Sequence, residues 1–535
     1  MAFERSYPAA RLPVQYSHAG MSDLRHGKCS LPQSLRGLLE PAAYPHAVDS
    51  IELVQTHISW LLLTGDYAYK IKRPVRYAFI DLTDPGRRAF DCREELRLNR
   101  RFAPSLYLEV CEIRADATGA HIGGPGQVIE HAVRMRQFDR DCELDRLLEA
   151  GRIEPDELGG FGRALARLHL QLPVARDPAP WATAARVRTL VLQNHEQAVD
   201  ACVAPALKAT LQALRAPLES RLAELESCID RRRSAGRVRE CHGDLHTRNV
   251  VRLGGELVAF DCLEFDEALR WIDVADEISF LSADLQARNA GAHAHAFLAG
   301  YLAESGDYEA CRLLPLYEAH RSLVRAKVTA LAGDERVADH VRTAQTSLER
   351  PRPQLILVSG LSGSGKTWLA KRLAPRLEAI HLRSDVERKR LAGVADMAHS
   401  DSAVGAGLYV PQASAEVYAH LEICAGHALA GGRSVIVDAT FGRREDRARF
   451  AALAKSYRVR ASLIFCSAPV EVLRHRIVER AARGSDASEA NLAVLDWQRA
   501  RFSEAVPEEG WARIDVHSTG SGPGPDLEAL TKALQ

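Results

Sequence analysis

The chain has 535 residues, which is enough for about two to four domains with buried cores. Lysine plus arginine and aspartate plus glutamate both number 70, so the formal net charge is zero. No global field therefore attracts nucleic acid or an anionic membrane surface. This balance disfavours a protein that coats nucleic acid and leaves room for a local basic pocket.

The cysteines and the apolar runs indicate where the protein works. Eleven cysteines are scattered without a CxxC pair, which is typical of a reducing compartment. Apolar runs such as residues 60–63 are far too short to cross a bilayer, and the N-terminus has no apolar segment of signal-peptide length. We therefore expect a soluble cytoplasmic protein with no membrane partner.

The first 100 residues divide into an irregular and a regular part. Residues 1–36 mix Pro, Gly, His and Arg without periodicity, which predicts a disordered extension whose start could be Met1 or Met21. From residue 51 the pattern predicts strands at 51–54, 58–63 and 67–73 and then a helix at 91–101. Alternation places Ala68, Lys70 and Lys72 on one face of the third strand.

The segment 241–266 carries the first set of chemical groups. It reads CHGDLHTRNVVRLGGELVAFDCLEFD, so Asp244 is followed five positions later by Asn249 and seventeen positions later by Asp261. An aspartate that deprotonates a hydroxyl, with an Asn and an Asp that hold magnesium, is the set that kinase-fold phosphotransferases need. Strands at 249–251 and 257–260, joined by a Gly-Gly turn, would bring Asn249 and Asp261 to one cleft.

The loop H-G-D-L-H-x-x-N at residues 242–249 resembles the catalytic loop of the aminoglycoside phosphotransferase-like family, small-molecule relatives of protein kinases. The resemblance implies an α+β protein-kinase-like two-lobe domain at 37–345, with Asp244 as catalytic base and Asn249 and Asp261 as magnesium ligands. Residues 67–70 are similar to the kinase V-A-x-K strand, which implies that Lys70 grips the ATP phosphates, with Lys72 as second candidate. Its helix partner is Glu94 or Glu95, and the pattern E-x-x-R-L-N favours Glu94.

One departure and two structural alternatives accompany this interpretation. No G-x-G-x-x-G motif precedes the lysine strand, so the turn at 55–59 would cover the phosphates. A zinc site is set aside because His242 and His246 have no second HxxxH or CxxC block; its four residues would be Cys241, His242, His246 and Cys262. A purely structural Asp/Asn turn is the other alternative.

Helices after the catalytic loop would shape the acceptor pocket. Asp273 and Asp276 resemble acidic residues that brace the loop in this family. Arg321 and Arg325 lie one turn apart on a predicted helix at 317–331, where we favour surface ion pairs over a phosphate role.

A second nucleotide motif follows a proline-containing linker at 346–354. The strand at 355–358 runs into GLSGSGKT, which is G-x-x-x-x-G-K-T in the strand–loop–helix context that this motif requires. Its backbone amides would surround the β-phosphate at a helix N-terminus, through Gly360, Gly363, Ser364 and Gly365. Lys366 would reach the β- and γ-phosphates and Thr367 would bind magnesium, so the motif predicts ATP or GTP binding.

Further strands at 379–383, 434–437, 461–465 and 513–516 alternate with helices. This predicts an α/β P-loop NTPase domain with a doubly wound parallel sheet at 355–535, with functional residues at the strand C-termini. D-x-x-R at 385–388 resembles the polynucleotide and gluconate kinase type of P-loop phosphotransferase. The resemblance implies that Asp385 accepts the acceptor proton, Arg388 holds an anionic group and Asp438 acts on magnesium through water.

Two features of this half have structural alternatives. Asp385 and Asp438 could be helix N-caps. Arg476 and Arg480, ahead of a flexible 484–488 segment, would belong to a mobile lid that neutralises the transferring phosphoryl group, or to a solvated basic face.

Together these features predict a tandem phosphotransferase that uses ATP and Mg²⁺, with each domain acting on a hydroxyl of a small-molecule acceptor. A nucleotide-binding regulatory protein is the main alternative, with a non-catalytic kinase-like half and a P-loop NTPase switch. A nucleic-acid 5′-end kinase in the C-terminal half is disfavoured by the neutral charge. A sugar-nucleotide kinase shares only the P-loop and the D-x-x-R pattern.

Overall fold

The computed structural model describes residues 31–77, 80–176, 179–349, 352–394, 411–483, 490–518 and 525–535. The chain forms two compact units. The first contains the residues up to Phe161, Leu168–Ala294 and Leu316–Leu348, and the second contains Gly162–Arg167, His295–Pro315 and Glu349–Gln535. The disorder expected at 1–30 lies outside the described residues.

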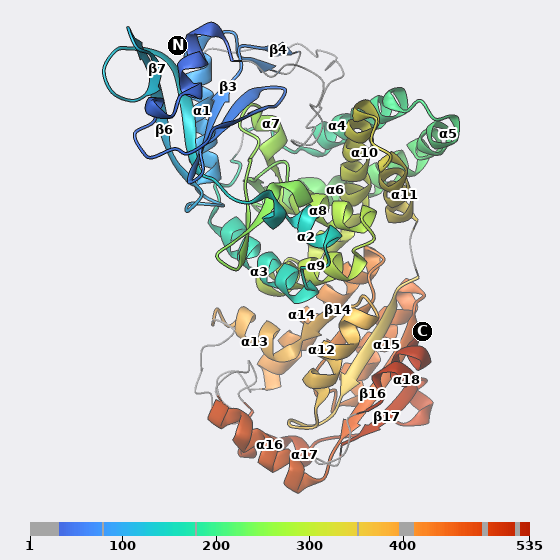
Figure 1. Cartoon of the computed structure of the whole chain (residues 1–535). Helices are drawn as coiled ribbons and strands as arrows, with labels where there is room; N and C mark the ends of the chain where they lie inside the picture. Colours follow the sequence, from blue (N-terminus) through green and yellow to red (C-terminus); the bar gives the residue numbers. More distant parts are fainter. Residues whose placement is uncertain are drawn as a thin grey trace. The chain divides into compact units, whose positions relative to one another are not determined.

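The first unit is built on a six-stranded antiparallel sheet (Figure 1). Its spatial order is β1 (Glu52–Gln55), β2 (Ser59–Leu63), β3 (Tyr67–Lys72), β8 (Gln127–Arg136), β6 (Tyr107–Asp116) and β7 (Gly119–Ile122). Helix α1 (Pro85–Asn99) begins at Asp84, whose carboxylate accepts the Arg87 N–H, and packs against β8, β6 and β3. The strands and the helix expected here are confirmed.

The two faces of this sheet are both covered, and side-chain alternation divides β3 between them. Tyr69 and Ile71 belong to one apolar core, whereas Ala68 packs with Cys92 of α1. Lys70 and Lys72 share the face of Ala68 and therefore point toward α1. Leu31 and Leu35 are buried in the other core, so the folded chain begins before residue 37, where sequence analysis placed the domain start.

The rest of the chain up to residue 348 is mainly helical. Its helices are η1 (Gln33–Leu39), η2 (Pro41–Ala43), η3 (Arg140–Cys142), α2 (Leu144–Glu149), α3 (Pro155–Gln171), α4 (Ala184–Ala201), α5 (Pro205–Ala213), α6 (Arg215–Ser234), η4 (Thr247–Asn249), α7 (Glu267–Arg270), α8 (Val274–Ala287), α9 (Gly291–Ser305), η5 (Tyr308–Arg312), α10 (Leu314–Ala332) and α11 (Val337–Leu348). Its short strands are β4 (Arg76–Tyr77), β5 (Ile80–Asp81), β9 (Val238–Glu240), β10 (Val250–Leu253), β11 (Glu256–Ala259) and β12 (Trp271–Asp273). Strands β10 and β11 form the expected hairpin, with Gly254 and Gly255 at positive φ in its turn.

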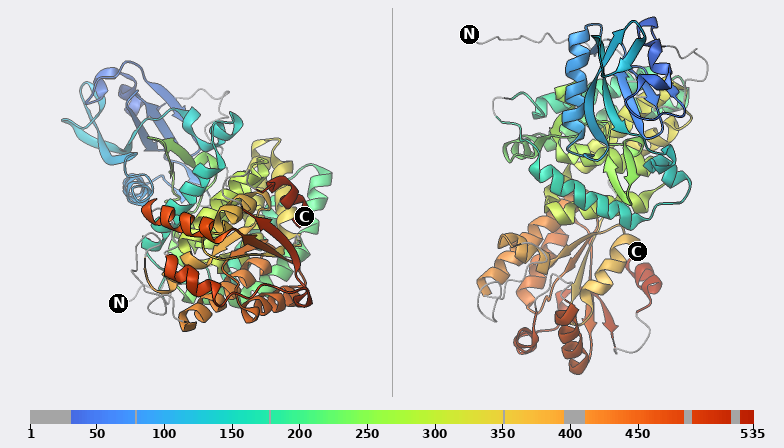
Figure 2. Two further views of the ribbon diagram at one scale, coloured as in Figure 1. Left: turned by 90° about the horizontal axis from the view of Figure 1, so that it is seen from below. Right: turned by 60° about the vertical axis from the view of Figure 1, so that its left-hand side comes forward.

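The second unit contains a five-stranded sheet in which all neighbours are parallel (Figure 2). Its order is β14 (Ile380–Arg383), β15 (Val435–Asp438), β13 (Gln354–Ser359), β16 (Arg460–Ser467) and β17 (Ala512–His517). The helices that follow the strands are α12 (Lys366–Arg376), α13 (Ser384–Leu391), α14 (Pro411–Ala430), α15 (Arg444–Tyr457), α16 (Val470–Arg483), α17 (Leu492–Arg499), η7 (Pro507–Glu509) and α18 (Leu527–Leu534).

Both faces of this parallel sheet are buried. Ile356, Ile436 and Ile464 pack toward α12 and α18, and alternation turns Leu355 and Leu357 to the opposite face, where α14 packs. The first strand of the unit lies in the middle, which places the P-loop at a switch point of the strand order. The doubly wound α/β fold is confirmed.

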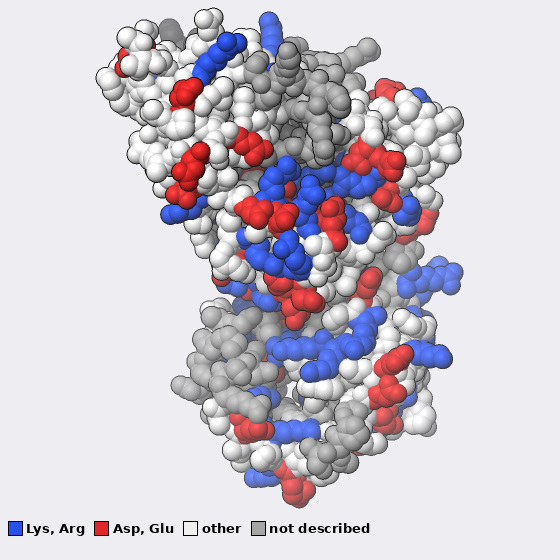
Figure 3. Space-filling view, viewed as in Figure 1, with Lys and Arg blue, Asp and Glu red and all other residues white. Residues whose placement is uncertain are grey.

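The described surface agrees with the neutral composition. Basic and acidic side chains are interspersed over the face drawn in Figure 3. Within the ranges given above, no helix combines the length and the hydropathy needed to cross a bilayer.

Candidate active sites

A buried ion network connects the sheet of the first unit with α1. The Lys70 ammonium lies 2.8 Å from Glu95 Oε1 and 2.6 Å from Asp261 Oδ1. Burial opposes its charged form, but the carboxylates of Asp261 and Glu95 outweigh burial and raise the pKa of Lys70. Lys72 lies beside it, 2.5 Å from Glu95 Oε2, and also contacts Glu264.

The partner of Lys70 is Glu95, so the expectation of Glu94 is wrong. Successive residues of a helix point about 100° apart, and the buried face of α1 presents Glu95, whose side chain is fully buried. The Glu94 side chain is 19% exposed and pairs with Arg97 at 2.8 Å. The motif spacing identified the helix correctly. It did not determine which of the two adjacent glutamates faces the lysine.

The catalytic loop is braced by its first histidine. The His242 Nε2–H donates to Phe260 O at 2.8 Å, and His242 Nδ1 accepts the Asp244 N–H at 3.3 Å. Burial lowers the pKa of His242 to about 4, so the ring stays neutral and can perform both roles. In the described ranges His242 therefore acts as a structural brace, and the zinc alternative of sequence analysis has no matching cluster among its four residues.

Two further carboxylates hold the loop, and sequence analysis did not select them. Glu277 Oε1 and Oε2 accept the backbone N–H groups of His242 and Gly243 at 2.8 and 3.0 Å. Asp284 Oδ2 accepts the Thr247 N–H at 3.0 Å. Both lie on the fully buried face of α8. In the sequence, they could have been found as carboxylates within an otherwise apolar helix.

The predicted residues Asp244, Asn249 and Asp261 lie on this braced loop and the following hairpin. Asn249 Nδ2 donates to Asp244 O at 2.9 Å and to Asp244 Oδ2 at 3.1 Å, and Asn249 O accepts the Phe260 N–H. Asp261 has a positive φ of 63°, and its N–H donates to Tyr107 Oη at 3.1 Å. The side-chain oxygens of Asn249 and Asp261 are the hard ligands that Mg²⁺ prefers.

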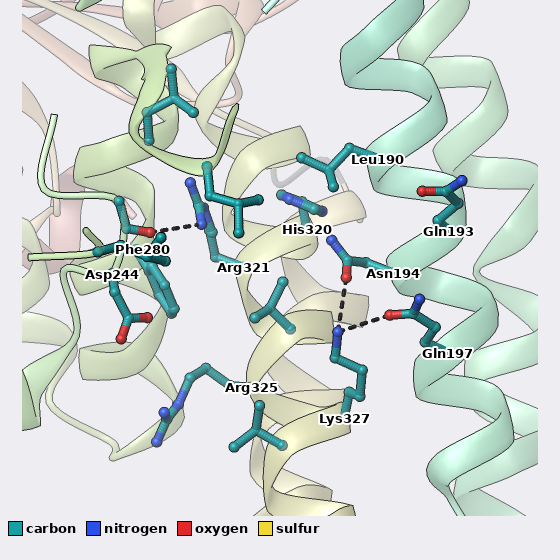
Figure 4. Close-up of a pocket in the computed structure, with 16 residues that line it drawn as sticks. Leu190, Gln193, Asn194, Gln197, Asp244, Phe280, His320, Arg321, Arg325 and Lys327 are labelled. Atoms are coloured by element: carbon teal, nitrogen blue, oxygen red, sulfur yellow. Dashed lines mark hydrogen bonds between the residues drawn. The ribbon is translucent and has the colours of Figure 1, made fainter. Parts of the chain in front are cut away.

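A pocket opens beside Asp244 (Figure 4) and encloses about 780 Å³ including its mouth. Its sixteen lining residues include one carboxylate, Asp244, and three cations, Arg321, Arg325 and Lys327. Lys327 of α10 donates to Asn194 Oδ1 and Gln197 Oε1 of α4 at 3.0 and 2.9 Å, and burial lowers its pKa to about 8.

The two arginines of this pocket are buried, which corrects the expectation of surface ion pairs. Arg321 forms two hydrogen bonds to Asp276, at 2.7 and 2.9 Å, and donates to Gly243 O. Arg325 Nε lies 3.6 Å from Asp284 Oδ1 and makes no hydrogen bond within the described ranges. Figure 4 shows the Arg325 guanidinium on the same side of the pocket as the Asp244 carboxylate.

The P-loop of the second unit has the backbone that its glycines permit. Gly360, Gly363 and Gly365 have φ of 141°, 83° and 93°, and a Cβ on Gly360 would lie 2.2 Å from Cys466 O. The buried Ser364 hydroxyl has no hydrogen-bond partner in the described part of the chain. An unsatisfied donor inside a loop of backbone amides fits a phosphate group.

Lys366 and the predicted metal-binding residues surround this loop. Burial lowers the pKa of Lys366, although the charges of Asp438 and Asp385 oppose the shift. The Thr367 hydroxyl donates to Asp438 Oδ2 at 2.6 Å. Asp438 ends β15 and Thr367 is the second residue of α12, so a hydroxyl and a carboxylate oxygen suited to Mg²⁺ meet at the carboxyl edge of the sheet.

The other predicted residues of this unit lie on α13 and α16. Asp385 is the second residue of α13, behind the cap residue Arg383, so the N-cap alternative does not apply to it; Arg388 lies on the same helix. Arg476 donates to Gly363 O of the P-loop at 3.3 Å, and Arg480 donates to Ala490 O at 2.8 Å. The lid segment expected at 484–488 lies outside the described residues.

The Glu95 assignment gives a prediction with a matched control. Glu95→Gln leaves two buried ammonium groups with one carboxylate fewer, and we expect the free energy of unfolding to fall by about 3–5 kcal/mol. Glu94→Gln removes a partly exposed pair and should cost at most about 1 kcal/mol. Urea unfolding of both variants measures the difference, and equal losses would contradict the assignment.

Glu277 gives a pH prediction. Burial raises its pKa from 4.5 to about 7, which corresponds to roughly 3 kcal/mol. A carboxyl with a raised folded pKa stabilises the fold below its unfolded pKa, and this contribution is lost as the pH rises through about 7. Glu277→Gln cannot ionise, so its free energy of unfolding should decrease less between pH 4.5 and 7 than that of the wild type. Parallel pH profiles from urea unfolding would refute this.

Comparison with known proteins finds a matching protein family for each of the two units. The Phosphotransferase enzyme family matches residues 66–314, and the AAA domain family matches residues 355–505. The uncharacterized protein Rv2004c of Mycobacterium tuberculosis is 31% identical over 483 residues, covering 86% of this chain and 93% of the relative. The uncharacterized protein Mb2027c of Mycobacterium bovis matches with the same values.

Solved structures resemble each part separately. Choline kinase from Cryptosporidium parvum covers 56% of this chain and 88% of its own, with 9% identity and a TM-score of 0.38. A putative kinase from Chloroflexus aurantiacus covers 34% of this chain and 97% of its own, with 24% identity and a TM-score of 0.29. The sequence matches show that the chain belongs to one family with these mycobacterial relatives, and that in this chain a Phosphotransferase enzyme family domain precedes a P-loop kinase domain.

Proposed function

We propose that the first unit transfers the γ-phosphoryl group of Mg–ATP to a hydroxyl of a small molecule held in the pocket beside Asp244. The observation that carries this proposal is the convergence of two linked pairs. Lys70 is bonded to Asp261, Asn249 is bonded to Asp244, and the β10–β11 hairpin connects the two pairs.

Each residue has a role that its contacts support. Asp244 lines the pocket and accepts the proton of the acceptor hydroxyl, while the Asn249 amide orients its carboxylate. Lys70 binds phosphate oxygens and is held in place by Glu95. Asn249 and Asp261 supply oxygen ligands for Mg²⁺, which neutralises phosphate charge when it is bound.

The second unit is proposed to perform a separate phosphotransfer. Its P-loop amides and Lys366 bind the nucleotide phosphates, and Thr367 and Asp438 provide oxygens for Mg²⁺. Asp385 acts on the acceptor hydroxyl and Arg388 on an anionic part of the acceptor. Arg476 and Arg480 neutralise the transferring group.

The lining of the first pocket supports a particular acceptor class. Three cations and one carboxylate line the pocket, and the carboxylates that face Arg321 and Arg325, those of Asp276 and Asp284, do not line it. The lining therefore offers more donors to an acceptor with a carboxylate or a phosphate than carboxylates to a polycation such as an aminoglycoside. Among the three, Arg325 is the best suited to bind the anion, because Arg321 is bonded to Asp276 and to Gly243. The proposed acceptor is therefore an anionic hydroxyl compound.

Separate variants test the two-site proposal. Asp244→Asn and Lys366→Ala should each reduce one phosphotransfer activity by about 10²–10⁴-fold and leave the other unchanged. Radiolabelled transfer from ATP to a panel of hydroxyl acceptors measures both activities. Loss of both activities from either single change would overturn two independent sites, and no dependence on Asp244 would favour a regulatory first unit.

The acceptor charge is tested with Arg325. Arg325→Gln should raise the KM for an anionic hydroxyl acceptor by about 10–100-fold, the value of one charge-assisted hydrogen bond. Arg342→Gln is the matched control, because this side chain is exposed on α11. Preferential phosphorylation of aminoglycosides, or an unchanged KM in the Arg325 variant, would refute the acceptor class.

A further inference from the structure

Three potential metal ligands meet between α13 and α14 of the second unit, outside both sites described above. Glu387 belongs to α13, and His420 and Cys424 belong to α14. Their ligand atoms all lie within 4.8 Å of one another. His420 Nε2 is 3.1 Å from Glu387 Oε2 and 3.4 Å from Cys424 Sγ.

The surrounding structure aims these atoms at one point. His420 and Cys424 are four residues apart, so they occupy the same face of α14 one turn from each other. The other carboxylate oxygen of Glu387, Oε1, accepts a hydrogen bond from Tyr308 Oη at 3.1 Å and one from Arg390. This arrangement turns Oε2 toward the two α14 side chains.

The hydrogen count limits what the protein alone can supply to these contacts. An imidazole Nε2 carries at most one proton. With that proton it donates to Glu387 and meets Cys424 Sγ only as a weak acceptor; without it, its lone pair faces the Glu387 carboxylate. A cation at the centre would satisfy the oxygen, nitrogen and sulfur atoms together.

We propose that Glu387, His420 and Cys424 form a binding site for a divalent transition-metal ion of the zinc class. Mixed oxygen, nitrogen and sulfur ligands suit Zn²⁺, and tetrahedral bonds of about 2.0–2.3 Å place neighbouring ligand atoms roughly 3.3–3.7 Å apart. The two measured separations are close to this range. Two anionic ligands oppose the charge of the ion, and the Arg390 guanidinium, which also bonds Glu387, adds one positive charge beside the site.

The exposure of the three side chains sets the ion's access and coordination. Glu387 is fully buried and Cys424 is buried, whereas the His420 side chain is 28% exposed. Solvent therefore reaches the cluster on the histidine side, which provides an entry path and a fourth ligand position for water. Three protein ligands with an open position are typical of zinc sites that exchange a ligand.

The ion would fasten α13 to α14. Helix α13 also carries Asp385, two positions before Glu387, and Arg388, which directly follows Glu387. Bound metal would therefore restrict the helix that presents these side chains, without contacting the P-loop residues themselves. The proposal does not depend on either phosphotransfer activity.

Cobalt titration of the full, metal-free chain tests the site. Binding of one Co²⁺ should produce a near-ultraviolet band from a cobalt–thiolate bond and visible bands of tetrahedral coordination, and Zn²⁺ should displace both. Cys424→Ser should abolish the thiolate band and His420→Gln should weaken Co²⁺ binding at least about 10-fold. Cys142→Ser, which changes a partly buried free cysteine elsewhere, should leave spectrum and affinity unchanged.

A thermal measurement makes the outcome independent of the spectrum. Zn²⁺ should raise the unfolding temperature of the wild type and of Cys142→Ser, and it should not raise that of His420→Gln. A thiolate band that survives in Cys424→Ser, or an equal Zn²⁺ effect in His420→Gln and the wild type, would overturn the proposal. If Cys424→Ser does not fold, His420→Gln alone decides by the same two readouts.

Discussion

The buried ammonium group of Lys70, held between Glu95 and Asp261, determines how the parts of the first site are assembled. Each member comes from a different element: β3, α1 and the segment after β11. An unpaired charge in this position would be strongly destabilising. The three elements must therefore be in register for the first unit to fold, and that register also brings Asp261 near the catalytic loop.

The electrostatic environment of the P-loop lysine in the second unit is the opposite. The pKa of Lys70 is raised because carboxylates outweigh burial, whereas the pKa of Lys366 is lowered because burial outweighs its neighbours. Lys366 donates to the Leu361 carbonyl, and the nearby Ser364 hydroxyl has no hydrogen-bond partner among the described residues. In the P-loop, a phosphate would supply a negative charge beside Lys366 and an acceptor for Ser364. In the first site, a phosphate would bind a lysine that already pairs with two carboxylates.

Sequence reasoning predicted correctly those features that are encoded by residues close together in the chain. The first three strands of the antiparallel sheet, the strands of the parallel sheet, the β10–β11 hairpin and the P-loop are encoded by alternation, by turn glycines and by a contiguous motif, whereas β6 and β7 were not predicted. It failed where the result depends on rotation or on distant partners. The choice between Glu94 and Glu95 depends on the rotation of α1, which a spacing of three or four residues does not fix.

The burial of charged side chains was equally hidden. Arg232 stands in a run of three arginines in the last turn of α6, yet its side chain is fully buried and pairs with Asp273, 41 residues away. Glu387, His420 and Cys424 are spread over 38 positions and match no metal motif, so only the packing of α13 on α14 shows that they meet. Such groups need long-range pairing information that one sequence does not contain.

The missing glycine motif of the first unit has a structural counterpart in the turn between β1 and β2. The Ser59 N–H donates to Thr56 Oγ1 at 2.9 Å, and Arg73 donates to the carbonyl oxygens of Thr56 and His57 at 2.6 and 3.0 Å. A glycine-rich turn approaches phosphates because it has no side chains. Here a cation instead neutralises two carbonyl dipoles that would repel phosphate, and the hydrogen bonds fix the turn before any ligand binds, which lowers the entropic cost of binding. The absence of glycines is therefore compatible with nucleotide binding.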